Sequence, residues 1–71
     1  HVNNLAYVRA MLGCCTAEEL TRVQTFEIHY ASPCLEGETL GVFCRREEGR
    51  CRMAVKHADG RPAVLAQVIF G

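Results

Sequence analysis

The spacing of apolar residues changes from a helical period to a strand period near residue 22, and this change most constrains the fold. Residues 2–12 are apolar on almost every side, interrupted only by two asparagines and Arg9, which is typical of a helix buried on most sides. From Phe26 onward, apolar and polar residues alternate in short runs, the period of strands with one buried face. The sequence therefore predicts an α+β fold in which one central helix precedes a four-stranded antiparallel sheet.

Local signals predict where these elements begin and end. Gly13 ends the first helix, and Thr16 with Glu19 forms a capping box that starts one or two short helical turns through Arg22. Pro33 ends the first strand. We expect turns at 36–38, 47–49 and 59–60 and strands near 26–30, 40–45, 51–56 and 63–70, paired in chain order as a meander. The scarcity of polar residues in 5–12 favours a sheet that wraps the helix, incompletely, with edges and one face left exposed.

Composition limits the class of protein. The 71 residues are one domain, and 49% of them are apolar, which is high for the small interior of such a chain and indicates a partner or a larger unit. The eight basic and eight acidic side chains balance to a net charge of zero, so the composition does not indicate a surface that binds nucleic acid. We expect no membrane span and no signal peptide.

Five cysteines stand at positions 14, 15, 34, 44 and 51. An odd count, an adjacent pair and the lack of a C-x-x-C motif argue against a disulfide framework and a zinc site. We therefore expect free thiols in a reducing cytoplasm and no bound metal or cofactor. Cys44 and Cys51 flank a turn and could face each other across a hairpin.

The chain opens with a polar group on an apolar helix: His1, Asn3 and Asn4. An imidazole and two carboxamides at a helix N-terminus place a proton acceptor and several donors beside unpaired backbone N–H groups, where developing negative charge is stabilised. Asn is also a good helix N-cap. Catalytic and structural interpretations of these residues both remain open.

The opening His-Val-Asn-Asn, followed by apolar residues and Tyr7, resembles the start of the central helix in hotdog-fold thioesterases. The segment 28–40, Ile-His-Tyr-Ala-Ser-Pro-Cys-Leu-Glu-Gly-Glu-Thr-Leu, is similar to the "Y-x-x-x-C/A-x-x-G-D-x-L" pattern of acyl-ACP thioesterases, and the closing strand also resembles bacterial members. The resemblance implies a partial hotdog domain over 1–71 that lacks its N-terminal strands, and hydrolysis of fatty acyl-ACP.

Two residues match the family's catalytic positions: His1, the catalytic histidine, and Cys34, once proposed as a papain-like nucleophile. Asn3 and Asn4 are candidate substrate-binding residues beside the thioester carbonyl. In the family an Asp and an Asn precede the histidine, and an acidic residue precedes the cysteine in plant members, where this chain has Pro33. Water activated by His1 with an upstream carboxylate is the expected nucleophile, and Cys34 the alternative.

Three functions remain open. The first is an acyl-ACP thioesterase whose partner is an acyl carrier protein, acting as a homodimer or paired with a second hotdog domain. The second is an acyl-CoA thioesterase of the 4-hydroxybenzoyl-CoA type, and the third a non-catalytic hotdog half used in dimerisation.

Several other side chains have simpler interpretations. We expect His29 and His57 to face solvent, and Tyr7 and Tyr30 to lie in the core. The arginines of the second hairpin (45, 46, 50 and 52) lie among Glu47 and Glu48, which favours a self-neutralised surface over a docking site for the carrier protein. Leu5, Val8, Met11 and Leu12 are expected to be core residues, although they could line a slot for an acyl chain.

Overall fold

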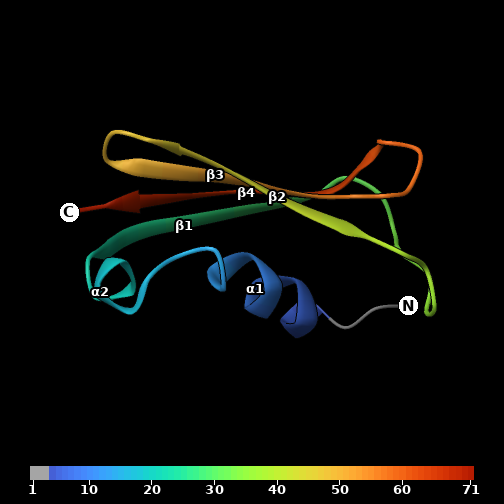
Figure 1. The fold of residues 1–71 in the computed structure, drawn as a ribbon, viewed down its shortest axis with the longest axis horizontal. Coiled ribbons are helices and arrows are strands. Elements are labelled where there is room, and N and C mark those ends of the chain that lie inside the picture. Colours follow the sequence, from blue (N-terminus) through green and yellow to red (C-terminus); the bar gives the residue numbers. More distant parts are fainter. Residues whose placement is uncertain (1–3) are drawn as a thin grey trace.

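The computed structural model describes residues 4–71, which form two short helices followed by four strands (Figure 1). The helices are α1 (Asn4–Leu12) and α2 (Ala17–Leu20), and the strands are β1 (Val23–Tyr30), β2 (Gly41–Glu47), β3 (Arg50–Lys56) and β4 (Pro62–Phe70). Every strand pair is antiparallel. The predicted α+β class, with a helix before a four-stranded antiparallel sheet, is confirmed. Within residues 4–71, no helix has the length and apolar character needed to cross a bilayer.

The strand order is β1-β4-β3-β2, so the predicted meander is wrong for the first strand. β2, β3 and β4 follow one another through short turns, but β1 pairs with β4 at the opposite edge from β2. The segment 31–40 is long enough to carry the chain from one edge to the other. Because β4 is the most apolar strand, a neighbour on each side buries it most completely.

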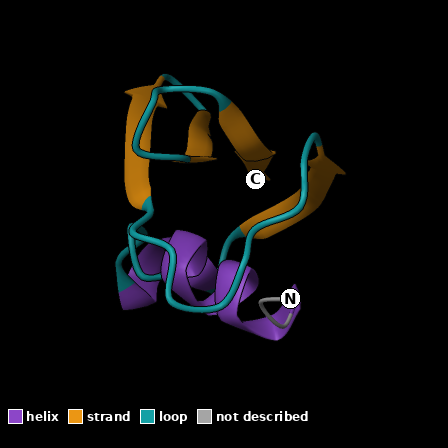
Figure 2. Cartoon of the chain, turned by 90° about the vertical axis from the view of Figure 1, so that its right-hand side faces the viewer, coloured by secondary structure: helices purple, strands orange, loops and turns teal. Residues whose placement is uncertain are grey.

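α1 packs on one face of the sheet, which arches over it (Figure 2). Tyr7 and Met11 point from the helix into the core and are 6% and 0% exposed. Alternate residues of the two central strands complete this core: Cys51, Met53, Val55, Val64, Ala66 and Val68. The far side of α1 is open, with Leu5 52% exposed. The expectation of a helix buried on most sides is therefore wrong, because the four strands cover one side of it.

The local signals for caps and turns are confirmed. The Thr16 side chain accepts a hydrogen bond from the Glu19 N–H at 3.1 Å, while the Thr16 N–H donates to the Glu19 carboxylate at 2.8 Å. Gly49 and Gly60 adopt φ of 75° and 91° in the two predicted strand connections. Glycine is favoured there because other side chains strain that backbone conformation.

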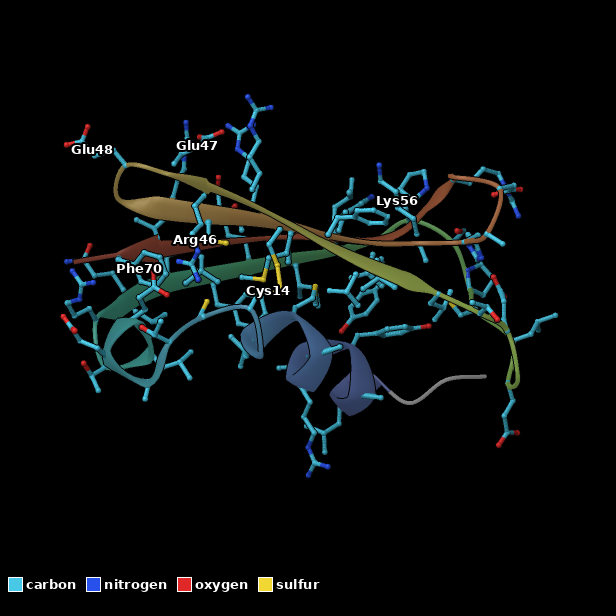
Figure 3. The ribbon with its side chains drawn as sticks, in the orientation of Figure 1. Cys14, Arg46, Glu47, Glu48, Lys56 and Phe70 are labelled. Carbon is cyan, nitrogen blue, oxygen red and sulfur yellow. A yellow bond between two sulfur atoms is a disulfide. The ribbon has the colours of Figure 1, made fainter. Side chains whose placement is uncertain are left out.

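Cys14 and Cys44 form a disulfide that joins the chain just after α1 to β2 (Figure 3). The expectation of free thiols is wrong for this pair, because docking of α1 on the sheet brings their Cα atoms within 6.6 Å. Cys44 does not face Cys51 across the hairpin, since its partner in the register is Met53. Cys15, Cys34 and Cys51 are free thiols, as predicted.

The arginines of the β2–β3 hairpin form ion pairs on both faces of the sheet. Glu47 lies near the arginines of the outer face, 2.7 Å from Arg50 Nε and 3.8 Å from the Nε atoms of Arg45 and Arg52. Arg46 points to the opposite face, where it binds Glu19 and the carbonyl of Cys14 (Figure 3). The predicted self-neutralised hairpin is therefore confirmed only in part, because three arginines share Glu47 and Arg46 pairs outside the hairpin with Glu19.

Candidate functional site

The residues expected from the sequence fall into two groups. His1 and Asn3 lie outside the described residues, and of Asn4 only the backbone, which begins α1, is described. Cys34 is described and is 1% exposed. It lies in the segment 31–40, at the end of the molecule where α1 begins and where the β3–β4 turn returns (Figure 1).

Hydrogen bonds at both ends hold the segment around Cys34 in place. The N–H groups of Ala31 and Ser32 both donate to the carbonyl of Ala63, at 2.8 and 3.1 Å. Further along, the Glu38 N–H donates to the Leu35 carbonyl at 3.1 Å, and the Glu38 carboxylate accepts from the Leu35 N–H at 3.1 Å. This closed turn fixes the backbone that carries Ser32, Cys34 and Glu38.

His57 lies at the centre of the polar contacts in this region. Its Nε2 is 2.8 Å from Ser32 Oγ, and its Nδ1 forms a hydrogen bond with the Glu38 carboxylate. The His57 N–H donates to the Arg61 carbonyl at 3.0 Å, which fixes the residue at the start of the β3–β4 turn. His57 is 8% exposed, so the expectation that it faces solvent is wrong. His29 is exposed, as predicted.

The alternation of β3 contains the signal that places His57 inside. Cys51, Met53 and Val55 are buried at odd positions, and His57 continues the same phase beyond the strand end. Ser32 and Glu38 carry no comparable signal, because they come from a segment without a repeating period. Their role depends on the tertiary contact between 31–40 and the β3–β4 turn.

The environment of Glu38 favours its charged form. Hydrogen bonding to the His57 ring lowers the pKa of the Glu38 carboxyl from its ordinary value, and the bond from the Leu35 N–H adds to this effect. A carboxylate that accepts from a ring nitrogen fixes the orientation of that ring. Glu38 therefore positions the imidazole of His57 in the way that a carboxylate positions histidine in hydrolytic triads.

Cys34 lies beside this group and against α1. Its Sγ, a Glu38 oxygen and a His57 ring nitrogen all lie within 4.8 Å of one another. Burial, together with a hydrogen bond to Cys34, raises the pKa of Tyr7 to about 12. Tyr7 is thus a core residue, as predicted. Tyr30 is 47% exposed, so the expectation that it lies in the core is wrong. Thiol, imidazole and carboxylate side chains are types that zinc accepts, but both ring nitrogens of His57 already have partners, Ser32 and Glu38.

A hollow of about 690 Å³ opens at this end of the molecule. Ser32, Glu38 and His57 line it together with Pro33, Leu35 and Arg61. Arg61 is held at the rim, its Nε 2.7 Å from an oxygen of Asp59. Polar groups able to move protons therefore border an open space with an apolar wall.

The apolar side chains of α1 behave mainly as core. Met11 is fully buried and Leu12 packs against the core, but Leu5 is 52% exposed.

Comparison with known proteins adds nothing to this picture, since no family model, curated protein or solved structure matches the chain.

Proposed function

We propose that this protein is a hotdog-type acyl thioesterase that hydrolyses fatty acyl-ACP to a free fatty acid and the carrier protein. The layout of one helix beneath an arched antiparallel sheet supports a hotdog fold (Figure 2). The residues of 1–4 and 28–40 that resemble this family support the substrate class.

One observation carries the proposal: α1, whose Tyr7 belongs to the first resembling stretch, meets the second resembling segment, 28–40, at one end of the molecule. Tyr7, in the first turns of α1, and Cys34 of the segment 31–40 are both buried in the same core cluster. Cys34 in turn lies beside the imidazole and carboxylate of His57 and Glu38. The thiol thus lies beside an acid–base pair, and that pair lines an open hollow, as hydrolysis of an acyl group requires.

The start of α1 supplies electrostatic stabilisation. Backbone N–H groups in the first turn of a helix have no partner within the helix and carry partial positive charge. A thioester carbonyl placed over them would be polarised, and the oxyanion formed on attack would be stabilised. In this scheme Asn3 and Asn4 bind the substrate, and His1 is an acid–base residue.

Burial argues against Cys34 as the attacking group. A thiol nucleophile must reach the carbonyl carbon of the substrate, and it is activated by a lowered pKa in an accessible site. At 1% exposure Cys34 is covered by its neighbours. We therefore assign Cys34 to packing at the site rather than to covalent catalysis.

The direct test is turnover by the purified full-length protein. Fatty acyl-ACP and the matching acyl-CoA are supplied separately, and the released fatty acid is measured. We expect faster hydrolysis of acyl-ACP, and loss of hydrolysis in His1→Ala. Faster hydrolysis of acyl-CoA would favour the 4-hydroxybenzoyl-CoA type, and full turnover in His1→Ala would remove His1 from the mechanism.

A non-catalytic hotdog half is the second candidate, and exposed apolar side chains favour it. Phe43 and Leu65 are 53% and 41% exposed, and both are paired with Ala54 in the register, on the sheet face away from α1. Such groups are typical of surfaces that another chain covers. Absence of hydrolysis together with a stable dimer would support this function over the first.

A further inference from the structure

We propose that Ser32 is the nucleophile of this site, with His57 as its general base and Glu38 as the residue that positions the imidazole. The inference rests on the proposed thioesterase function and deepens it, because it names the group that accepts the acyl chain. The expected pair of His1 and Cys34 includes none of these three residues, although Ser32 and Glu38 lie within the segment 28–40 that carries the resemblance.

The three side chains form a continuous hydrogen-bonded row. Ser32 Oγ is 2.8 Å from His57 Nε2, and His57 Nδ1 is bonded to the Glu38 carboxylate. A nucleophile within hydrogen-bond reach of a base that a third group orients is the geometry of activated hydroxyl catalysis. Both ring nitrogens are engaged, so the imidazole is fixed in one orientation.

The hydroxyl of Ser32 has two acceptors within reach. It donates to the Pro62 carbonyl at 2.9 Å, and His57 Nε2 lies at 2.8 Å. When the imidazole is neutral, Nδ1–H donates to Glu38 and Nε2 is free to accept the Ser32 proton. Rotation of the hydroxyl from Pro62 to Nε2 then prepares Oγ for attack, without any movement of the backbone.

Accessibility separates Ser32 from Cys34. Ser32 is half-buried and lines the 690 Å³ hollow, whereas Cys34 is 1% exposed and does not line it. A substrate that enters the hollow therefore meets the hydroxyl before the thiol. Pro33 and Leu35, on either side of Cys34, form part of the apolar wall of the same hollow and suit an acyl chain.

The reaction proceeds in two steps. Ser32 Oγ forms a bond to the thioester carbonyl carbon while His57 takes the hydroxyl proton. The C–S bond then breaks, and the leaving thiolate receives that proton from His57, leaving an acyl ester on Ser32. In the second step His57 takes a proton from water, the hydroxide displaces Ser32 from the acyl carbon, and Ser32 recovers the proton as the fatty acid leaves.

Covalent labelling tests this assignment, because Ser32 is the only serine in the sequence. The full-length protein is treated with an alkyl fluorophosphonate, which phosphonylates activated serines with loss of fluoride, and the labelled peptide is identified by mass spectrometry. We expect one label, on the peptide that contains Ser32, and none in Ser32→Ala. Loss of the general base in His57→Gln should slow labelling by about 100-fold or more.

Two further variants separate catalysis from structure. Thr39→Ser places a second hydroxyl in the same segment but outside the row, and that new serine should stay unlabelled. Glu38→Gln keeps the shape of Glu38 but removes its charge, and it should change the pH profile of labelling, which a merely structural contact would leave unchanged. Unfolding midpoints of all variants show which of them remain folded.

The outcomes distinguish this inference from the proposed function. Hydrolysis of acyl-ACP without a label on Ser32, or with full activity in folded Ser32→Ala, overturns the inference and leaves the thioesterase standing. A label on Ser32 without thioester hydrolysis supports an activated serine and overturns the substrate class. Neither label nor hydrolysis overturns both.

Discussion

Replacement of Met11 by Ala tests whether one face of α1 holds the helix on the sheet. The Met11 side chain is 0% exposed and belongs to the core cluster. Truncation of a buried methionine costs about 2–5 kcal/mol, because packing contacts are lost and a cavity remains. Since domains carry about 0.05–0.15 kcal/mol of stability per residue, a chain of 71 residues has about 4–11 kcal/mol in total. Met11→Ala should therefore remove a large part of the free energy of unfolding.

Leu5→Ala is the matched control on the same helix. Leu5 is 52% exposed, and its truncation should cost less than about 1 kcal/mol, as is usual for surface substitutions. Both variants are unfolded in urea with the disulfide intact and followed by circular dichroism. Equal losses in the two variants, or a larger loss in Leu5→Ala, would refute the packing of α1 through Tyr7 and Met11.

Three other predictions concern stability. Cys44→Ser removes the link to Cys14 across a sequence separation of 30, and it should lower the free energy of unfolding by about 3–4 kcal/mol. A reductant should have the same effect on the original protein and none on the variant's midpoint. The pKa of Glu38 is lower in the folded protein than its ordinary value of 4.5, so its ionised carboxylate stabilises the fold. This contribution is complete at pH values above 4.5 and is lost as the pH falls through the lowered pKa. The fall of the melting temperature on acidification below 4.5 should therefore be shallower in Glu38→Gln, and an unchanged slope would contradict the His57–Glu38 bond. Thr16→Ala should cost about 1 kcal/mol in urea unfolding, since it removes the cap of α2.

Local features of this fold could be predicted from the sequence because they depend on neighbouring residues. The capping box of Thr16 and Glu19 closes within four residues, and Gly49 and Gly60 supply the backbone conformation that their turns need. The alternation of apolar residues likewise places four strands, within a few residues of their observed ends.

Features that depend on long-range contacts could not be predicted. The position of β1 beside β4 follows from the path of 31–40, for which the sequence has no periodic signal. The Cys14–Cys44 disulfide likewise exists because α1 docks against the sheet next to β2.

The candidate site was only partly predictable for the same reason. Cys34 could be identified through its position in a family pattern, but its burial against Tyr7 requires the folded chain. The alternation of β3 predicts that His57 is buried, whereas its position just before the Asp59-Gly60 turn favours exposure to solvent. The partners of His57, Ser32 and Glu38, become visible only when two distant segments meet.

Cleavage of the thioester between a fatty acid and its carrier is the proposed activity of this protein. The most direct measurement is the intact mass of acyl-ACP after incubation with the purified full-length protein. We expect the mass of the carrier to fall by that of the acyl group, with an equal amount of free fatty acid released. A carrier mass that stays unchanged beyond the spontaneous rate in buffer would contradict it.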